Sequence, residues 1–162
     1  MSQAVSPLWQ PSSARTVAVD GLLPLPRGVL PTDLPPLIWP TKDPGDVLDY
    51  TLDLSAALAG DPTDQVASVG VTVQPSGNPG DLLAGKVASG GTGAVVWLSA
   101  GVTGTVYAVN LSIGTLKGRV IGRTVLLPVQ PLASTPPPSN PLFADTGTVI
   151  TDQNGNPILI GG

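Results

Sequence analysis

The chain has 162 residues, a net charge of −4 and neither Cys nor His. These absences exclude a disulfide framework, a thiolate metal site and the commonest general base of enzymes. Seven basic residues against eleven acidic ones leave no strongly basic face, so we expect no nucleic-acid partner. Only 11% of the residues are charged, while Gly and Pro number 20 and 19. This composition favours strands and loops, and it is typical of a chain that works inside an assembly.

Residues 1–40 contain eight of the nineteen prolines together with many leucines and valines and two tryptophans. Prolines at this density prevent a helix and are expected to break any sheet pairing, which leaves an extended chain of polyproline type. The many apolar residues, however, are unlike those of a disordered linker. We interpret this segment as an N-terminal arm that lies along another protein, with packing on its own domain as the alternative.

Residues 41–132 are predicted to form the folded domain. Residues 47–54 alternate apolar and polar side chains, as in a half-buried strand. Further strands are expected at 66–73, 81–88, 94–99, 104–113 and 119–129, separated by turns rich in Gly and Pro. Short strands about ten residues apart, without a helical period, predict an all-β sandwich.

Residues 133–162 are predicted to form a second arm. The proline-rich residues 134–141 make a semi-rigid spacer, and 147–151 and 157–160 flank an Asn154-Gly155 pair that is typical of a tight hairpin turn. A lone hairpin is marginally stable in water. We therefore expect this one to add to a sheet edge on a neighbouring protein, and the alternative is a frayed tail.

Two groups of acidic residues invite a catalytic interpretation. Asp145-Thr146-Gly147 is the triplet of aspartic proteases, but too little chain follows it to build a protease lobe, so we interpret it as a turn. Asp49 and Asp53 lie too far apart along a strand for paired acid catalysis and are expected on a solvated strand face. We therefore predict no enzyme and no cofactor.

Four aspartates in two predicted loops would make a cation site only if the loops met: Asp43, Asp46, Asp61 and Asp64. No calcium-loop spacing accompanies them, and turn chemistry explains them without a metal. The one basic cluster, formed by Lys117, Arg119 and Arg123, either meets an acidic partner or is an ordinary outward face. We predict no metal site.

The aromatic residues are divided between the arm and the domain. Trp97 is predicted to be core, and pattern also places Tyr50 inward. Trp9 is expected to anchor an interface, because aromatic side chains in an extended arm are good anchors. Trp39 either anchors an interface or covers the start of the sandwich. Tyr107 is the remaining candidate for a carbohydrate-binding platform.

Residues 1–15 lack the basic and apolar regions of a signal peptide, and the apolar stretches are far too short to cross a bilayer. We therefore expect synthesis in the cytoplasm and no membrane partner.

Two strings in the middle domain resemble a known family. The first is WPTKDPGDVLDYTLDLS at 39–55, followed by LAGD at 58–61. The second is VWLSAG at 96–101, followed by GTVY at 104–107 and GR at 118–119. Their order and spacing are similar to those of small phage proteins known as fiber–tail adaptors.

The resemblance departs from the family pattern at Leu54, where Trp is usual, and at Ala100, where Gly is usual. Both are packing or turn substitutions and leave the implied fold intact. The resemblance implies an immunoglobulin-like sandwich in a bacteriophage virion protein that joins the tail, through its adaptor or nozzle or its tube, to the receptor-binding fiber. It covers about residues 42–130, so the roles of both arms are separate predictions.

We expect the arms to dock on these tail proteins and copies of the chain to form a symmetric ring in the tail, after synthesis in the bacterial host. The expected docking residues are the large apolar residues of the arms: Leu8, Trp9, Leu22, Leu23, Leu25, Leu30, Trp39, Val149, Ile150, Ile158, Leu159 and Ile160. Two alternatives use the same fold class: a capsid decoration or head-fiber protein, and a carbohydrate- or surface-binding module.

Overall fold

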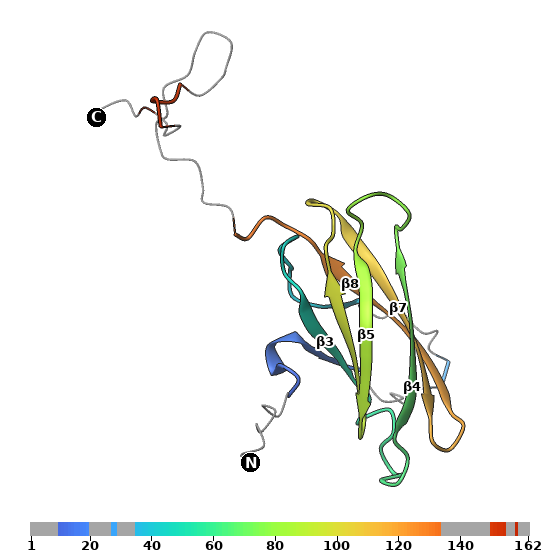
Figure 1. Cartoon of the computed structure of the whole chain (residues 1–162). Coiled ribbons are helices and arrows are strands. Elements are labelled where there is room, and N and C mark those ends of the chain that lie inside the picture. The colour runs from blue at the N-terminus through green and yellow to red at the C-terminus, as the bar shows by residue number, and fades with distance from the viewer. Residues whose placement is uncertain (1–9, 20–26, 29–34, 134–149, 155–157, 159–162) are drawn as a thin grey trace, which may run out of the picture. The chain divides into compact units, whose positions relative to one another are not determined.

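A computed structural model describes residues 10–19, 27–28, 35–133, 150–154 and 158 (Figure 1). The chain divides into two units, Met1–Leu132 and Ala133–Gly162. The first unit contains two four-stranded sheets packed face to face. Its strands are β1 (Thr16–Ala18), β2 (Leu37–Ile38), β3 (Leu48–Asp53), β4 (Val66–Gln74), β5 (Leu83–Gly90), β6 (Gly93–Ser99), β7 (Val106–Thr115) and β8 (Val120–Pro128). The predicted all-β sandwich is therefore confirmed.

The strand order is β1-β3-β6-β5 in the first sheet and β2-β8-β7-β4 in the second. All pairs among β3 to β8 are antiparallel. The six strands expected between residues 47 and 129 all form, and each end lies within two residues of its predicted position. The period-2 alternation and the turn residues between the strands account for this agreement.

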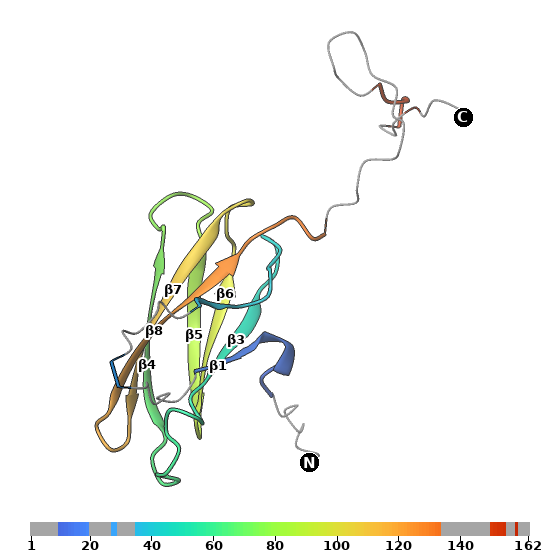
Figure 2. The ribbon, with the colours of Figure 1, turned by 180° about the vertical axis from the view of Figure 1, so that it is seen from behind.

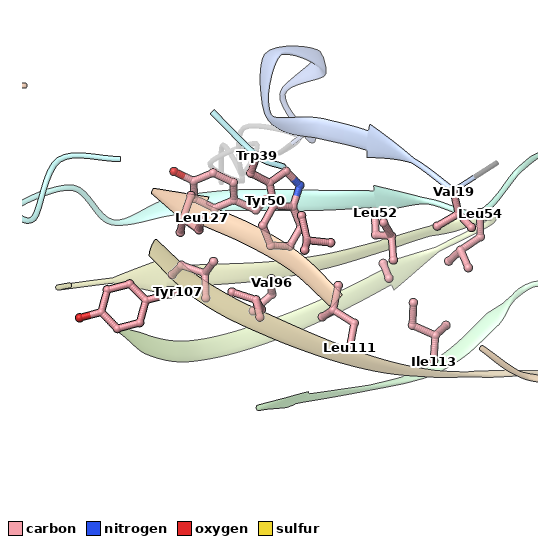
Figure 3. Close-up of a cluster of buried hydrophobic side chains, with 14 of the residues drawn as sticks. Val19, Trp39, Tyr50, Leu52, Leu54, Val96, Tyr107, Leu111, Ile113 and Leu127 are labelled. Carbon is pink, nitrogen blue, oxygen red and sulfur yellow. The ribbon is translucent and has the colours of Figure 1, made fainter. Parts of the chain in front are cut away.

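The core lies between the two sheets (Figure 3). Leu52 of β3 and Val96 of β6 face Leu111 of β7 and Leu127 of β8, and each of these side chains is at most 3% exposed. Full burial of one such side chain contributes about 1.5–3 kcal/mol, so this layer is the main source of stability.

The described parts of residues 1–40 add one short strand to each sheet. β1 runs parallel to β3, with Thr16 opposite Thr51 (Figure 2), and β2 runs parallel to β8, with Leu37 opposite Val125. Val19, which follows β1, is 2% exposed and belongs to the core. The expectation that prolines break sheet pairing throughout this segment is therefore wrong, because no proline lies within either strand and their N–H groups are intact.

The second unit is described at residues 150–154 and 158. The backbone N–H of Ile158 donates to the Ile150 carbonyl at 2.9 Å, and the N–H of Asn154 donates to Oδ1 of Asp152 at 2.8 Å. The first bond joins the two segments expected to pair as a hairpin, and the second is an Asx turn between them.

Candidate functional site

The docking residues predicted in the arms lie mostly outside the described part of the chain. Nine of them do so: Leu8, Trp9, Leu22, Leu23, Leu25, Leu30, Val149, Leu159 and Ile160. Ile150 is half-buried and Ile158 is 41% exposed within the second unit. The docking role of these eleven residues stays a prediction.

Trp39 is buried inside the sandwich, beside Tyr50 (Figure 3). Its indole Nε1–H donates to the Thr51 carbonyl at 3.0 Å, and its ring centroid lies 5.2 Å from that of Tyr50. A buried indole N–H needs such an acceptor. The prediction that Trp39 docks on a partner is therefore wrong, and the alternative, that it covers its own domain, is correct.

Arg15 fastens the chain before β1 to β3. Its Nη2–H donates to Oδ1 of Asp49 at 2.6 Å, and its Nε–H donates to the Asp49 carbonyl at 2.7 Å. Asp49 is 8% exposed, so the expectation of a solvated strand face is wrong for this residue. Burial raises the pKa of Asp49, but the hydrogen bonds from Arg15 and from the backbone outweigh burial and hold that pKa below its usual range.

Trp97 lies on the outer face of the first sheet. It pairs with Asp49 in the β3–β6 register and is partly exposed, and the Lys86 ammonium sits 4.7 Å from its ring centroid. Its neighbours Val96 and Leu98 point the other way and are in the core. The prediction that Trp97 is a core residue is therefore wrong.

Tyr107 is fully buried, and its hydroxyl makes two hydrogen bonds. Its hydroxyl donates to Oδ1 of Asp81 at 3.0 Å and accepts the Val102 N–H at 2.9 Å. Tyr50 is also buried, and burial raises the pKa of its hydroxyl to about 12. Neither tyrosine is available as a stacking platform for a sugar, so the expectation that Tyr107 provides one is wrong.

The tip of the β7–β8 hairpin binds the loop before β4 through an ionic network. Lys117 Nζ donates to Oδ1 of Asp61 at 2.6 Å, and Arg119 Nη1 contacts both Asp61, at 3.2 Å, and Asp64. Thr115 Oγ1 donates to Oδ2 of Asp64 at 2.9 Å. The hydrogen bond from Lys117 is the main reason why the pKa of Asp61 is lowered.

This network changes the interpretation of the charged residues. Lys117 and Arg119 neutralise acids of their own chain, so the predicted basic cluster is not a free basic face. Asp43 instead accepts the Gly45 and Leu132 N–H groups, both at 2.8 Å. No group of three or more metal-ligating side chains occurs among the described residues.

Lys42 is a structural residue for which the sequence offered no signal. Its side chain is fully buried, and Nζ donates to the carbonyls of Asp43 at 2.6 Å and Ala100 at 2.8 Å. Burial lowers the pKa of Lys42 by more than the negative charges of Asp46 and Asp43 raise it. The bond to Ala100 ties the chain after β2 to the turn after β6.

Two remaining expectations concern catalysis and membranes. Asp145, in the protease-like triplet, lies outside the described residues. Within the described ranges, no helix is long and apolar enough to cross a membrane.

In the described part of the chain, the charged and aromatic side chains hold strands and loops to one another. The fold therefore defines the class of the protein as an all-β sandwich. Residues 42–128 match the family Gp77, described as podophage GP4 fiber-tail adaptor protein gp77. The match spans more than half of the 162 residues, so the chain belongs to this family. No curated protein matches the chain.

Membership confirms the resemblance seen in the sequence. The protein is a structural, non-catalytic component of the virion tail, and it links the tail to the fiber. Its partners are therefore tail and fiber proteins.

Proposed function

We propose that the sandwich is an immunoglobulin-like spacer from which the flanking segments reach the tail and the fiber. If β3 to β8 are equated with strands B to G, the two sheets follow the immunoglobulin orders ABED and GFC, with β2 added beside β8. The parallel pairing of β1 with β3 adds a short edge to this arrangement without altering the order of the other strands.

Tyr107 supports the same assignment. Immunoglobulin domains carry a tyrosine near the start of strand F whose hydroxyl bonds to the backbone a few residues upstream. Tyr107 is the second residue of β7, and its hydroxyl accepts the N–H of Val102. This tyrosine corner is a feature of the sequence that strand alternation alone does not reveal.

The residues of each arm that remain for docking are those that do not contact the sandwich. Residues 12–19 and 35–40 contain the anchors of the first segment, so docking falls to the apolar residues around Trp9 and at 22–30. In the second segment it falls to the hairpin that contains Ile150 and Ile158. The observation that carries this division is the separation of Ala133–Gly162 from the sandwich as its own unit.

We also propose that copies of the chain form a symmetric ring in the tail. Closed symmetry is the usual arrangement of homo-oligomers, and a ring lets each weak arm contact be repeated around one axis. The low content of charged residues, 11%, is consistent with a chain that is buried among partners.

Binding by full-length variants tests the division of roles. Two variants are compared: Trp9→Ser, and a double variant with Ile150→Ser and Ile158→Ser. Each should abolish co-purification with one tail or fiber protein and leave the melting temperature unchanged. Trp97→Ser is the matched control on the outer face of the sandwich and should leave both contacts intact. Normal binding by the arm variants would overturn the proposal. Gold labelling of whole particles at the capsid would instead favour the head-fiber alternative.

A further inference from the structure

β4 is the longest edge strand in the described part of the sandwich. It spans nine residues and pairs with β7 on one side. No described strand is hydrogen-bonded along its other side, although β5 of the opposite sheet lies close to it. An open edge of this length presents a row of backbone N–H and C=O groups to which another strand can bind. The two edge strands from the N-terminal segment have only three and two residues.

The backbone groups that face the open edge can be identified from the neighbouring hairpin. The N–H of Thr115 donates to the Arg119 carbonyl, and the N–H of Val129 donates to the Thr105 carbonyl, both at 2.9 Å. The odd-numbered residues of β7 therefore direct their backbone groups toward β8, and the even-numbered ones direct theirs toward β4.

The even-numbered residues of β7 lie opposite Gly70, Thr72 and Gln74, which therefore bond to β7. Val69, Val71 and Val73 alternate with them, so their N–H and C=O groups point to the open edge. A strand added there would form its ladder with these three valines.

β4 also lacks the features with which natural edge strands resist pairing. Lys86 and a register shift between Ala84 and Val87 protect the other long edge strand, β5. β4 reads VASVGVTVQ, with no charge and no proline, and its register shift is confined to its first residues, between Val66 and Ser68. The contrast shows one protected edge and one receptive edge.

An apolar strip runs along the same side of the sandwich. The side chains of Val69, Val71 and Val73 pack against the core but are only half-buried. Val87, on the neighbouring β5, pairs with the buried Val96 and so points toward the core side, yet it is 44% exposed. Alternate apolar side chains of an added strand would cover these valines.

We propose that this edge binds the C-terminal hairpin, residues 147–160, of a second copy of the chain. The inference rests on the docking role proposed above for that segment. Both expected strands of the hairpin, GTVIT and PILI, are free of charge and suit an uncharged edge. The hairpin is marginally stable by itself, so it gains most from an existing sheet.

The length of the spacer allows the hairpin to reach a second copy. Residues 133–146, if extended as proline-rich chain, span about 40 Å at about 3.1 Å per residue. The nine residues of β4 span about 30 Å. The hairpin can therefore leave its own sandwich entirely. Because each copy has one hairpin and one edge, the contact is head-to-tail and closes into a ring when the rotation allows.

Cysteine pairing tests the contact directly, since the full chain contains no Cys. Thr72→Cys on β4 is mixed with Ile150→Cys or with Ile158→Cys under mild oxidation. We expect a mixed disulfide to form about tenfold or more faster than with Thr124→Cys, because docking raises the local thiol concentration. Thr124 is exposed on β8, away from the edge, and is the matched control.

Two outcomes would overturn the proposal. One is equal rates for Thr72→Cys and the control. The other concerns a double variant that carries both Thr72→Cys and Ile158→Cys. If its dilute solution forms a disulfide within one chain, and the single variants form none between chains, the hairpin lies on its own sandwich.

Val71→Pro, combined with the cysteine pair, separates edge pairing from simple proximity. It removes an N–H that points to the open edge and spares the ladder to β7, whereas Val71→Thr keeps that N–H. The mixed disulfide should fall to the control rate with Pro and persist with Thr, at melting temperatures that confirm folding. Persistence with Pro would overturn the edge as the site.

Failure of this inference is distinguishable from failure of the proposed function. If no mixed disulfide forms while Ile150→Ser with Ile158→Ser still abolishes binding to a tail or fiber protein, the hairpin docks on that protein and not on a second copy.

Discussion

The two proline-rich flanks of the sandwich differ in how they are held. In the first flank, Arg15 binds Asp49, and Val19 and Trp39 enter the core with exposures of 2% and 1%. The second flank, Ala133–Gly162, is a unit of its own. Proline density therefore predicts an extended chain but does not predict what the chain lies on. What decides this is whether a few residues of the chain, such as Arg15 and Trp39, contact buried groups of the sandwich.

The largest expected effect comes from removing the main anchor of the first flank. Trp39→Ala should lower the free energy of unfolding by about 3–5 kcal/mol, because it leaves a cavity beside Tyr50 and removes the hydrogen bond to the Thr51 carbonyl. Urea unfolding of the full chain measures this loss.

Trp97→Ala is the matched control for this substitution. It removes the same side chain from the outer face, where it is partly exposed, so its cost should stay below about 2 kcal/mol. Equal losses for the two variants would contradict the assignment of Trp39 as the anchor.

The six long strands were predictable because their alternation and turns are local features of the sequence. β1 and β2 were not, because they have only three and two residues and pair in parallel with strands far along the chain. Their pairing depends on tertiary contacts that no local pattern encodes.

Trp97 was misplaced for a related reason. Both faces of the segment 94–99 are apolar, so alternation does not tell which face is inward. Ala94, Val96 and Leu98 fill the core, which leaves Val95 and Trp97 on the outer face of the sheet, where Val95 is buried and Trp97 is partly exposed. The ion network of Asp61 and Asp64 was equally hidden, since it depends on two loops meeting.

The second expected effect concerns the ion pair that holds β1. Arg15→Ala should cost about 1–3 kcal/mol, because it leaves the nearly buried Asp49 without its charged partner, although the partial exposure of Arg15 limits the loss. Amide exchange in β1 should accelerate more than exchange in β7. A uniform change across all strands would contradict a local anchor.

The same pair gives a pH signature. The pKa of Asp49 is lowered in the folded state, so its contribution is present above its unfolded pKa of about 3.9 and is lost as pH falls through the folded value. The unaltered chain should therefore lose more stability than Arg15→Ala on acidification below about pH 4. Parallel curves for the two proteins would exclude Asp49 as the titrating group.

The smallest expected effect concerns the turn after β6. The carbonyl of Ala100 in this turn accepts a hydrogen bond from Lys42, which follows the first flank in the chain. Ala100 has φ +58, a conformation that costs a non-glycine residue about 1 kcal/mol, so Ala100→Gly relieves strain. Glycine also adds about 0.4–1 kcal/mol of unfolded-state entropy, and the two effects nearly cancel. The hydrogen bond from Lys42 Nζ needs only the backbone carbonyl of residue 100 and is therefore retained.

Gly101→Ala is the matched control one residue along. Gly101 has φ +111, and an added Cβ would lie 2.9 Å from Cγ2 of Val129, so this substitution should destabilise the chain by more than about 1 kcal/mol. Thermal unfolding of both variants measures the difference. A near-zero change for Ala100→Gly beside a clear loss for Gly101→Ala would show that the side chain of residue 100 adds nothing to the stability of this turn, whereas Gly101 is required there. A large loss for Ala100→Gly would mean that the side chain of residue 100 contributes as well.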